Sequence, residues 1–317
     1  MRRLIFLLLA WAALCVGAQV RVGIAWQRSV DNYDRVIHSI VAAGAEPVIL
    51  EQLRPAALDY DGINVRDSLL DEHGILLQPW ADRVKRDTWH GSRADEALRD
   101  IDAVVFLGGG DVCPTLFAVP QPWHGIEAET NHDATRDLSE YLTMAYCLDH
   151  DIPLLGLCRG MQLLGIVSGA PLIQDLGTHL ASLGKRDRYV HRGDRDREGN
   201  RHYVAHDVVV TDRHSLLWSI ARTDTIHGAP SWHHQVVSDV TGTPLRVTAI
   251  ACDDGVDIIE AIERTDKRFA LGVQYHPETA VRKHLDHEPD EALFMSVDEG
   301  LAYFRALVQA AQSSKIN

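Results

Sequence analysis

The most constraining feature of this sequence is a buried-strand pattern that runs directly into a turn flanked by glycines. Residues 152–157 are almost wholly apolar, which is typical of a central strand of a parallel sheet. Cys158 follows, with Gly156 and Gly160 two places to either side, and a helical pattern comes next. Such a turn forces its central side chain outward, and the glycines avoid a backbone clash. The pattern predicts that Cys158 stands at the carboxyl edge of a parallel sheet.

Strand-like runs alternate with helical patterns along the rest of the chain, which favours a sheet covered by helices. Strands are expected at 20–25, 47–50, 103–107, 152–157, 207–211, 245–251, 258–262 and 270–274, and helices at 33–43, 94–98, 133–150, 160–169 and 297–312. We therefore predict an α/β three-layer sandwich with a mostly parallel central sheet.

The domain organisation follows from the length of the chain and from the absence of a linker sequence. The 317 residues contain no Pro/Ser-rich linker, so a single domain over 19–317 is predicted. Residues 52–98 are polar, irregular and rich in Asp and Arg, and we interpret them as an insertion. Residues 185–202 are dense in Arg, Asp, Gly and His, which is typical of a mobile surface loop.

The first residues have the pattern of a leader. Met1-Arg2-Arg3 is a short positive start, an apolar run follows, and Val16-Gly17-Ala18 supplies small residues for cleavage. A buried first strand is the alternative, but strand-like residues resume at once after residue 19. We predict a signal peptide at 1–18 and export to the periplasm or medium, with a cytoplasmic location as the alternative. After removal of the leader, no stable membrane association is expected.

Net charge and composition limit the classes of binding partner that are compatible with this sequence. The formal charge is −14 without a long basic run, which argues against a broad nucleic-acid or anionic-membrane surface. Apolar residues make up 46 % of the chain and charged residues 24 %, as in ordinary globular proteins. A local pocket for a small-molecule substrate remains compatible with this balance. The oligomeric state is left open.

Four cysteines stand outside the predicted leader: Cys113, Cys147, Cys158 and Cys252. An even number in an exported protein is compatible with two disulfides, so the state of the other three is left open. The chain has no Cys-x-x-Cys pair, which argues against a zinc ribbon and a thioredoxin-like site.

A second segment carries groups that would complement a cysteine nucleophile. His276-Pro277-Glu278 comes just past the expected strand 270–274, and sites in open α/β sheets form at the carboxyl ends of strands. His276 would take the thiol proton and return it to a leaving amine, and Glu278 would fix the imidazole tautomer. The alternatives are an inert core cysteine and a turn with a solvated glutamate.

A third segment offers backbone donors. Gly108-Gly109-Gly110 follows the expected strand 103–107, and the amides of Gly109 and Gly110, with that of Arg159, would form an oxyanion hole. A phosphate-binding loop is the rival interpretation, but no Lys-Ser/Thr follows the glycines.

The 17 histidines raise the question of a metal site. His202 and His206, and His284 and His287, have spacings that could share a helix face, but neither pair lies in a helical pattern. We interpret both pairs as solvated loop histidines and predict no metal site. The adjacent His233 and His234 are expected to point in different directions.

Together, the three segments resemble the class I glutamine amidotransferase-like superfamily, and within it the γ-glutamyl-γ-aminobutyrate hydrolase and γ-glutamyl hydrolase families. The most specific matches are Cys158-Arg159-Gly160-x-Gln162 and residues 272–278. Weaker ones are Asp133-x-x-Arg136-Asp137, Ser231-x-His233-His234-Gln235, and Asp254-Gly255 leading to Ile259-Glu260-Ala261. Pro230 departs from the family pattern, in which an Asn often precedes the serine.

The resemblance implies hydrolysis of a γ-glutamyl amide through a γ-glutamyl thioester on Cys158, without a cofactor. It also implies that Gln162, Ser231, His233 and Gln235 place the glutamyl group, and that Asp137 holds the local fold. Two alternatives remain: a glutaminase that supplies ammonia to a synthase partner, and a non-catalytic binding member of the fold. A leader and the absence of an ATP site argue against the first, and an intact Cys, His and Glu set argues against the second.

Overall fold

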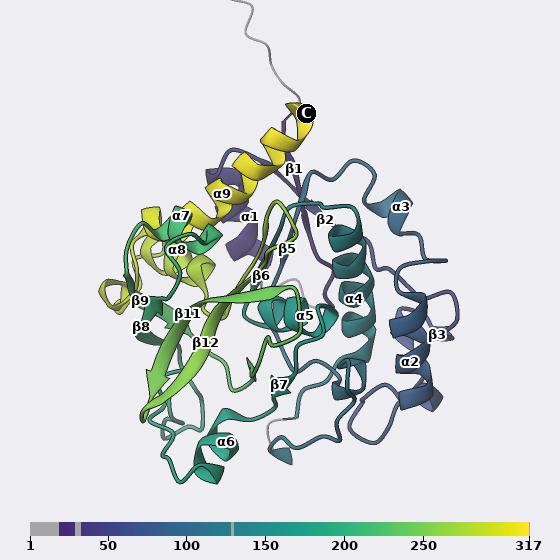
Figure 1. The fold of residues 1–317 in the computed structure, drawn as a ribbon, viewed down its shortest axis with the longest axis horizontal. Coiled ribbons are helices and arrows are strands. Elements are labelled where there is room, and N and C mark those ends of the chain that lie inside the picture. The colour runs from purple at the N-terminus through teal and green to yellow at the C-terminus, as the bar shows by residue number, and fades with distance from the viewer. Residues whose placement is uncertain (1–18, 29–32, 128–129, 317) are drawn as a thin grey trace, which may run out of the picture.

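The computed structural model describes residues 19–28, 33–127 and 130–316, so the predicted signal peptide at 1–18 lies outside the described residues. Within the described part, nine strands form one mixed sheet in the order β2-β1-β5-β6-β13-β12-β11-β8-β9 (Figure 1). In that order the strands are Glu46–Ile49, Arg21–Ile24, Ala103–Phe106, Leu154–Leu157, Ala270–Val273, Val256–Arg264, Leu245–Asp253, Val204–Val210 and Thr225–Ser231. The α/β class predicted from the sequence is confirmed.

The sheet has a parallel half and an antiparallel half. Strands β2, β1, β5, β6 and β13 run parallel, and β12, β11, β8 and β9 continue from β13 in antiparallel pairs. Strand β9 was missed in the sequence because Gly228 and Pro230 interrupt the alternation expected of a strand. The parallel half matters for function, because β5, β6 and β13 all end at one edge.

Helices cover both faces of this sheet. On one face, α4 (Ala134–Asp149) and α5 (Arg159–Val167) share a core with Val104, Phe106 and Leu154. On the other, α1 (Tyr33–Ala42) and α9 (Val297–Ile316) pack on Val105 and Leu155. Neighbouring residues of β5 and β6 therefore point into opposite cores, as the two-residue period of a strand requires. In Figure 1, α9 (yellow) and α4 (teal) lie on opposite sides of these strands.

Residues 52–98 carry more structure than their composition suggested. They contain a hairpin, β3 (Tyr60–Asp61) and β4 (Asn64–Val65), and the helices α2 (Gln78–Asp87) and α3 (Ala94–Ala97). Scattered apolar side chains of the segment are buried in the core that also contains α4: Leu53, Leu58, Val65, Leu69, Ile75, Leu76, Ala81, Val84, Ala94 and Leu98. The expectation of a polar, irregular segment was therefore wrong, because its few apolar residues converge only in the tertiary fold. Its origin as an insertion stays a prediction.

The remaining elements of the described residues are short. They are β7 (Leu172–Ile173), paired with β10 (Val236–Val237), and the helices α6 (Leu176–Ser182), α7 (Leu216–Ala221) and α8 (Pro277–Leu285). Residues 185–202 contain no helix or strand, as expected, yet His191 within them is buried. Of the helices in the described ranges, none has the length and apolar character needed to span a membrane. Cys113, Cys147, Cys158 and Cys252 are unpaired thiols.

Candidate active site

Cys158 occupies a strained turn between β6 and α5. Its backbone has φ 51° and ψ −104°, a conformation that costs a non-glycine residue about 1–3 kcal/mol. The flanking glycines make the turn possible: a Cβ on Gly156 would lie 2.6 Å from the backbone of Gly160, and one on Gly160 would lie 2.5 Å from the carbonyl oxygen of Phe106. Because the strained residue begins a helix, the helix dipole favours the thiolate.

His276 lies between Cys158 and Glu278. Its Nδ1 is 2.7 Å from Oε1 of Glu278, and its side chain also interacts with Cys158. Burial by itself would lower the pKa of His276, but the neighbouring Tyr203, Glu278 and Cys158 raise it well above the ordinary value. A raised pKa at His276 favours transfer of the thiol proton from sulfur to the neutral imidazole, which leaves a thiolate beside an imidazolium.

The sulfur of Cys158 has two further polar neighbours. The amide Nε2 of Gln274 donates to Sγ across 3.4 Å, and the thiol can donate to the carbonyl oxygen of Trp232 at 3.9 Å. Gln274 is fully buried and also accepts a 3.4 Å hydrogen bond from Gln162. The sequence had placed Gln274 in a matching motif without a role, and the structure gives it one as a donor that holds the sulfur. Cys113 contrasts with this, because burial and Asp137 raise the pKa of its thiol well above normal.

The glycine turn after β5 packs directly against this pair. A Cβ on Gly108 would lie 2.7 Å from Cε1 of His276 and 3.6 Å from Cβ of Cys158. Gly109 has φ 156°, and a Cβ there would meet the guanidinium of Arg136 at 2.0 Å. The turn is therefore within reach of a carbonyl bound at Cys158, where its amides can stabilise an oxyanion.

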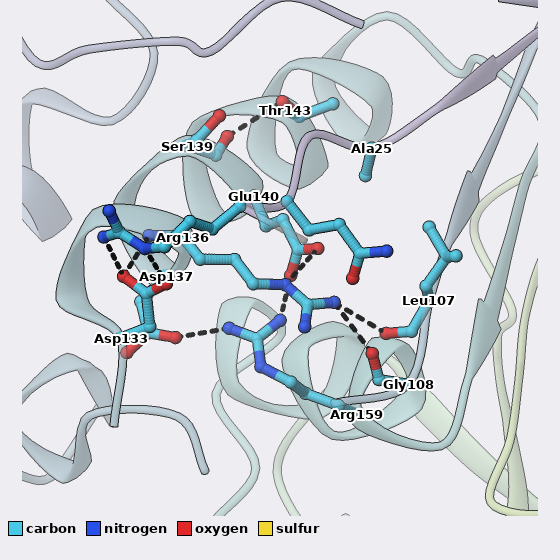
Figure 2. Close-up of polar contacts among 12 residues, drawn as sticks. Ala25, Leu107, Gly108, Asp133, Arg136, Asp137, Ser139, Glu140, Thr143 and Arg159 are labelled. Carbon is cyan, nitrogen blue, oxygen red and sulfur yellow. Dashed lines mark hydrogen bonds and ion pairs between the residues drawn. The ribbon is translucent and has the colours of Figure 1, made fainter. Parts of the chain in front are cut away.

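A buried ion cluster holds both halves of the site in place (Figure 2). The Arg159 guanidinium pairs with the carboxylates of Asp137 and Glu140, and all three side chains are at most 1 % exposed. Arg136 bonds Glu140 at 3.0 Å and donates to the carbonyl oxygens of Leu107 and Gly108 at 3.3 and 2.9 Å. Two cations thus balance two carboxylates, and the cluster links Arg159, the residue after Cys158, to the glycine turn.

A cavity of about 420 Å³ opens over Cys158. The lining includes the triad, the turn 108–110, and three of the four residues expected to place substrate: Gln162, His233 and Gln235. Sequence reasoning missed four polar residues of the remaining lining, which come from distant segments: Arg35, Asn131, Arg192 and Tyr203. Trp232 and His234 lie in the Ser231–Gln235 motif and Asp111 follows Gly110, so these three stand in segments that the sequence had singled out. No local pattern marks Arg35, Asn131, Arg192 and Tyr203, because these four meet at the cavity only in the folded chain.

Ser231 is the expected substrate residue that the structure does not bring to the cavity. It is fully buried at the end of β9, and its hydroxyl donates to the carbonyl oxygen of His191 at 2.7 Å. This contact joins β9 to the loop 185–202, which is a positioning role.

His233 and His234 point in different directions, as expected of neighbours. His234 Nε2 lies 2.9 Å from Asp111 and its Nδ1 lies 3.4 Å from Asp175. Burial alone would lower the pKa of His234, but these two carboxylates raise it to about 9. His233 turns to the interior, where burial lowers its pKa to about 4. His206, expected to be a solvated loop residue, is instead buried on β8, because alternate residues of that strand face the core.

The site lies within a segment that matches a known family. Residues 87–278 match the Peptidase C26 family, and the match includes Cys158, His276 and Glu278. The chain belongs to the Peptidase C26 family. The resemblance found in the sequence is thereby confirmed, and a hydrolase is the class of enzyme that this membership supports.

The names of curated relatives differ. The γ-glutamyl-γ-aminobutyrate hydrolase of Escherichia coli K12 is 29 % identical over 188 residues, which is 59 % of this chain and 68 % of that protein. Protein NtpR of Enterococcus hirae is 30 % identical over 201 residues, covering 63 % and 75 %. A protein of Rickettsia prowazekii named as glutamine amidotransferase-like is 28 % identical over 280 residues, covering 78 % and 88 %.

Solved structures support the fold. The glutaminase domain of the Trypanosoma brucei CTPS, solved with bound acivicin, superposes with a TM-score of 0.50 at 17 % identity, covering 93 % of this chain and 94 % of that one. At this identity the likeness speaks for a shared fold alone.

Proposed function

We propose that this protein hydrolyses γ-glutamyl amides through a γ-glutamyl thioester on Cys158. The observation that carries the proposal is the placing of His276 between Cys158 and Glu278, beside a glycine turn, at the floor of a cavity. Membership of Peptidase C26 and the name of the E. coli relative support the same reaction class.

The geometry fits a two-step reaction. The Cys158 thiolate attacks the γ-carbonyl carbon, and the oxygen takes negative charge opposite the amides of Gly109, Gly110 and Arg159. His276, which holds the thiol proton, passes it to the nitrogen as the carbon–nitrogen bond breaks and the amine leaves. Water then gives a proton to His276 and attacks the thioester, which releases glutamate and returns the proton to sulfur. Glu278 keeps Nε2 of His276 directed at the reacting atoms throughout.

Recognition of the glutamyl group is assigned to the polar lining of the cavity. The α-carboxylate of the substrate would find cationic partners in Arg35, Arg192 and His234, while Asp111 and the amide oxygens of Gln162 and Gln235 suit an α-ammonium group. The departing amine would leave through the open side of the cavity, where Tyr203 and Trp232 stack edge to face with ring centroids 5.1 Å apart. That aromatic wall suits the hydrocarbon part of an amine or peptide.

The direct test compares the purified protein with two variants on a panel of γ-glutamyl amides. Cys158→Ala is expected to abolish turnover, and Cys252→Ala, which removes an exposed thiol outside the cavity, is expected to retain it. Mass spectrometry of wild-type protein quenched in acid should show an adduct of one glutamyl group on Cys158. Equal turnover by wild type and Cys158→Ala would refute the mechanism.

A glutaminase that feeds ammonia to a synthase is the second candidate, and the amidotransferase-like names among the relatives favour it. The same panel separates the two functions. Ammonia released from free glutamine only when a partner protein is added would favour the glutaminase, whereas turnover of γ-glutamyl amides by the isolated chain favours the hydrolase.

We also propose that the protein is exported after cleavage behind Ala18, on the leader pattern of residues 1–18. N-terminal sequencing of protein recovered from cell fractions should begin at Gln19. An intact Met1 in the cytosolic fraction would contradict export without bearing on the reaction.

A further inference from the structure

A cluster of buried histidines lies beside the active-site cavity, apart from the triad, and shares His233 with the lining of that cavity. His191, His206 and His233 surround the carboxylate of Glu260, and their side chains are nearly inaccessible to solvent. The four residues come from the loop 185–202, from β8, from the segment after β9 and from β12. None of them takes part in the reaction steps assigned to Cys158.

The distances in the cluster match the spacing of ligands around a metal ion. His191 Nδ1 lies 3.0 Å and His233 Nε2 lies 3.4 Å from Oε1 of Glu260. The edge of a zinc tetrahedron with bonds of about 2.0–2.1 Å is about 3.3 Å. Within the described residues, none of these atoms has a partner in hydrogen-bond geometry, although each is fully buried. Such orphaned atoms are costly unless a cation or a proton joins them.

The outer contact of His233 has the arrangement found around metal ligands, and His206 makes the same kind of contact. Nδ1 of His206 lies 2.9 Å from the carbonyl oxygen of Val190, and Nδ1 of His233 lies 3.1 Å from that of Gln235. A carbonyl oxygen only accepts, so both rings carry a proton on Nδ1 and turn Nε2 to Glu260. Metal-ligating histidines donate their other ring nitrogen in this way. One extra proton would satisfy a single imidazole, whereas one metal ion would satisfy several at once.

We propose that His191, His233 and Glu260 bind one divalent transition-metal ion, with Zn²⁺ as the best match. Their ligand atoms all lie within 4.8 Å of one another, and two imidazoles with one carboxylate are a zinc donor set that leaves a fourth position open. His206 acts as a positioning residue, because its Nε2 lies 3.5 Å from Oε2, the second oxygen of Glu260. A neighbouring cavity of about 370 Å³, lined by His191 and His233, provides a path for the ion.

The ion would add a link between three segments that are far apart in the sequence, two of which are already joined by a hydrogen bond from the His233 N–H to the carbonyl oxygen of His191 at 3.0 Å. It would tie the loop that carries His191 to strand β12 and to the segment that presents Trp232 and His233 to the active-site cavity. The sequence predicted no metal site because its histidine pairs were judged by short spacings, and His191 and Glu260 meet only in the folded chain.

The test uses the Cys158→Ala protein, so that the catalytic thiol cannot hold the added ion. After dialysis against a chelator, calorimetric titration with Zn²⁺ is expected to show about one equivalent bound. His191→Gln and Glu260→Gln are expected to weaken this binding at least 100-fold, because ligands are lost. The matched control is His227→Gln, which removes an exposed histidine paired with Asp207 and should leave binding unchanged.

Two further measurements keep the proposal open to refutation if a variant fails to fold. Zn²⁺ at a hundredfold excess over Kd should raise the Tm of Cys158→Ala by about 5 °C. X-ray absorption at the zinc edge of the Cys158→Ala protein loaded with one equivalent of Zn²⁺ should show nitrogen and oxygen neighbours only. A sulfur neighbour, an unchanged Tm or undiminished binding by folded His191→Gln would each overturn the site. Since no turnover is measured, failure here is distinct from failure of the proposed hydrolase.

Discussion

Replacing Arg159 with Met should lower the free energy of unfolding by several kcal/mol. The substitution leaves two buried carboxylates facing one cation. Arg159 is 1 % exposed and pairs with Asp137 and Glu140, which are equally buried. Removing one partner of a buried ion pair costs about 3–5 kcal/mol. Met fills much of the volume of the arginine stem. The loss of unfolding free energy therefore reflects the uncompensated charge more than the creation of a cavity.

The sharper result comes from a double-mutant cycle. Glu140→Gln alone leaves two buried arginines facing Asp137 and should cost about 3 kcal/mol. Combining the two changes leaves one cation, Arg136, facing Asp137, so charge balance is restored. The double variant should therefore be about as stable as Arg159→Met alone, a coupling of about 3 kcal/mol.

The assay is urea unfolding followed by far-ultraviolet circular dichroism, with the slope of the free energy against urea checked for constancy. Arg305→Met is the matched control, because its pairing with Asp298 lies at the surface, where such pairs contribute below about 1 kcal/mol. Additive costs for Arg159→Met and Glu140→Gln would refute the claim that charge balance stabilises this cluster. A cost for Arg159→Met as small as that of the control would refute the claim that the pair is buried.

Three other perturbations test the site and its support. Glu278→Gln should keep the fold but lower kcat at least about 100-fold, because Nδ1 of His276 loses its carboxylate partner at 2.7 Å. A pH–rate profile of the variant measures this loss. An unchanged kcat would contradict the role of Glu278 beside His276. Gly160→Ala should lower the free energy of unfolding in urea by about 3 kcal/mol, because its Cβ would lie 2.5 Å from the carbonyl oxygen of Phe106. Gly177→Ala should be tolerated, because the nearest neighbour of its Cβ would be a side-chain oxygen at 3.3 Å. Equal costs would contradict the packing argument. Asp175→Asn tests acid stability: burial by itself would raise the pKa of Asp175, but hydrogen bonds from His234 and Thr178 hold it at about 2, against 3.8 unfolded. The carboxylate of Asp175 therefore contributes stability above pH 4, and this contribution is lost as the pH falls towards 2. Asp175→Asn should be less stable than the wild type by about 1–2 kcal/mol at pH 6 and equal to it near pH 2. A difference that persists at pH 2 would contradict the linkage between the pKa and stability.

The sequence determined the parts of this protein that depend on local geometry. Glycines at 156 and 160 around Cys158 define the elbow, because each contact that excludes a Cβ lies within a few residues of the turn or on the strand beside it. The apolar runs of β5, β6 and β13 define the parallel half of the sheet by length and burial alone. His276 could be placed near Cys158 because parallel strands end at a common edge.

The tertiary structure decided whatever depends on residues far apart in the chain. The pairing of Arg159 with Asp137, the burial of residues 52–98 and the meeting of His191 with Glu260 leave no periodic trace in the sequence. For Ser231, a sequence motif predicted a place at the cavity that the fold does not provide. The hydroxyl of Ser231 is instead bound to the carbonyl oxygen of His191. A sequence specifies which backbone turns are sterically possible, but partners for buried polar groups are set by long-range packing, where each contact depends on the whole fold.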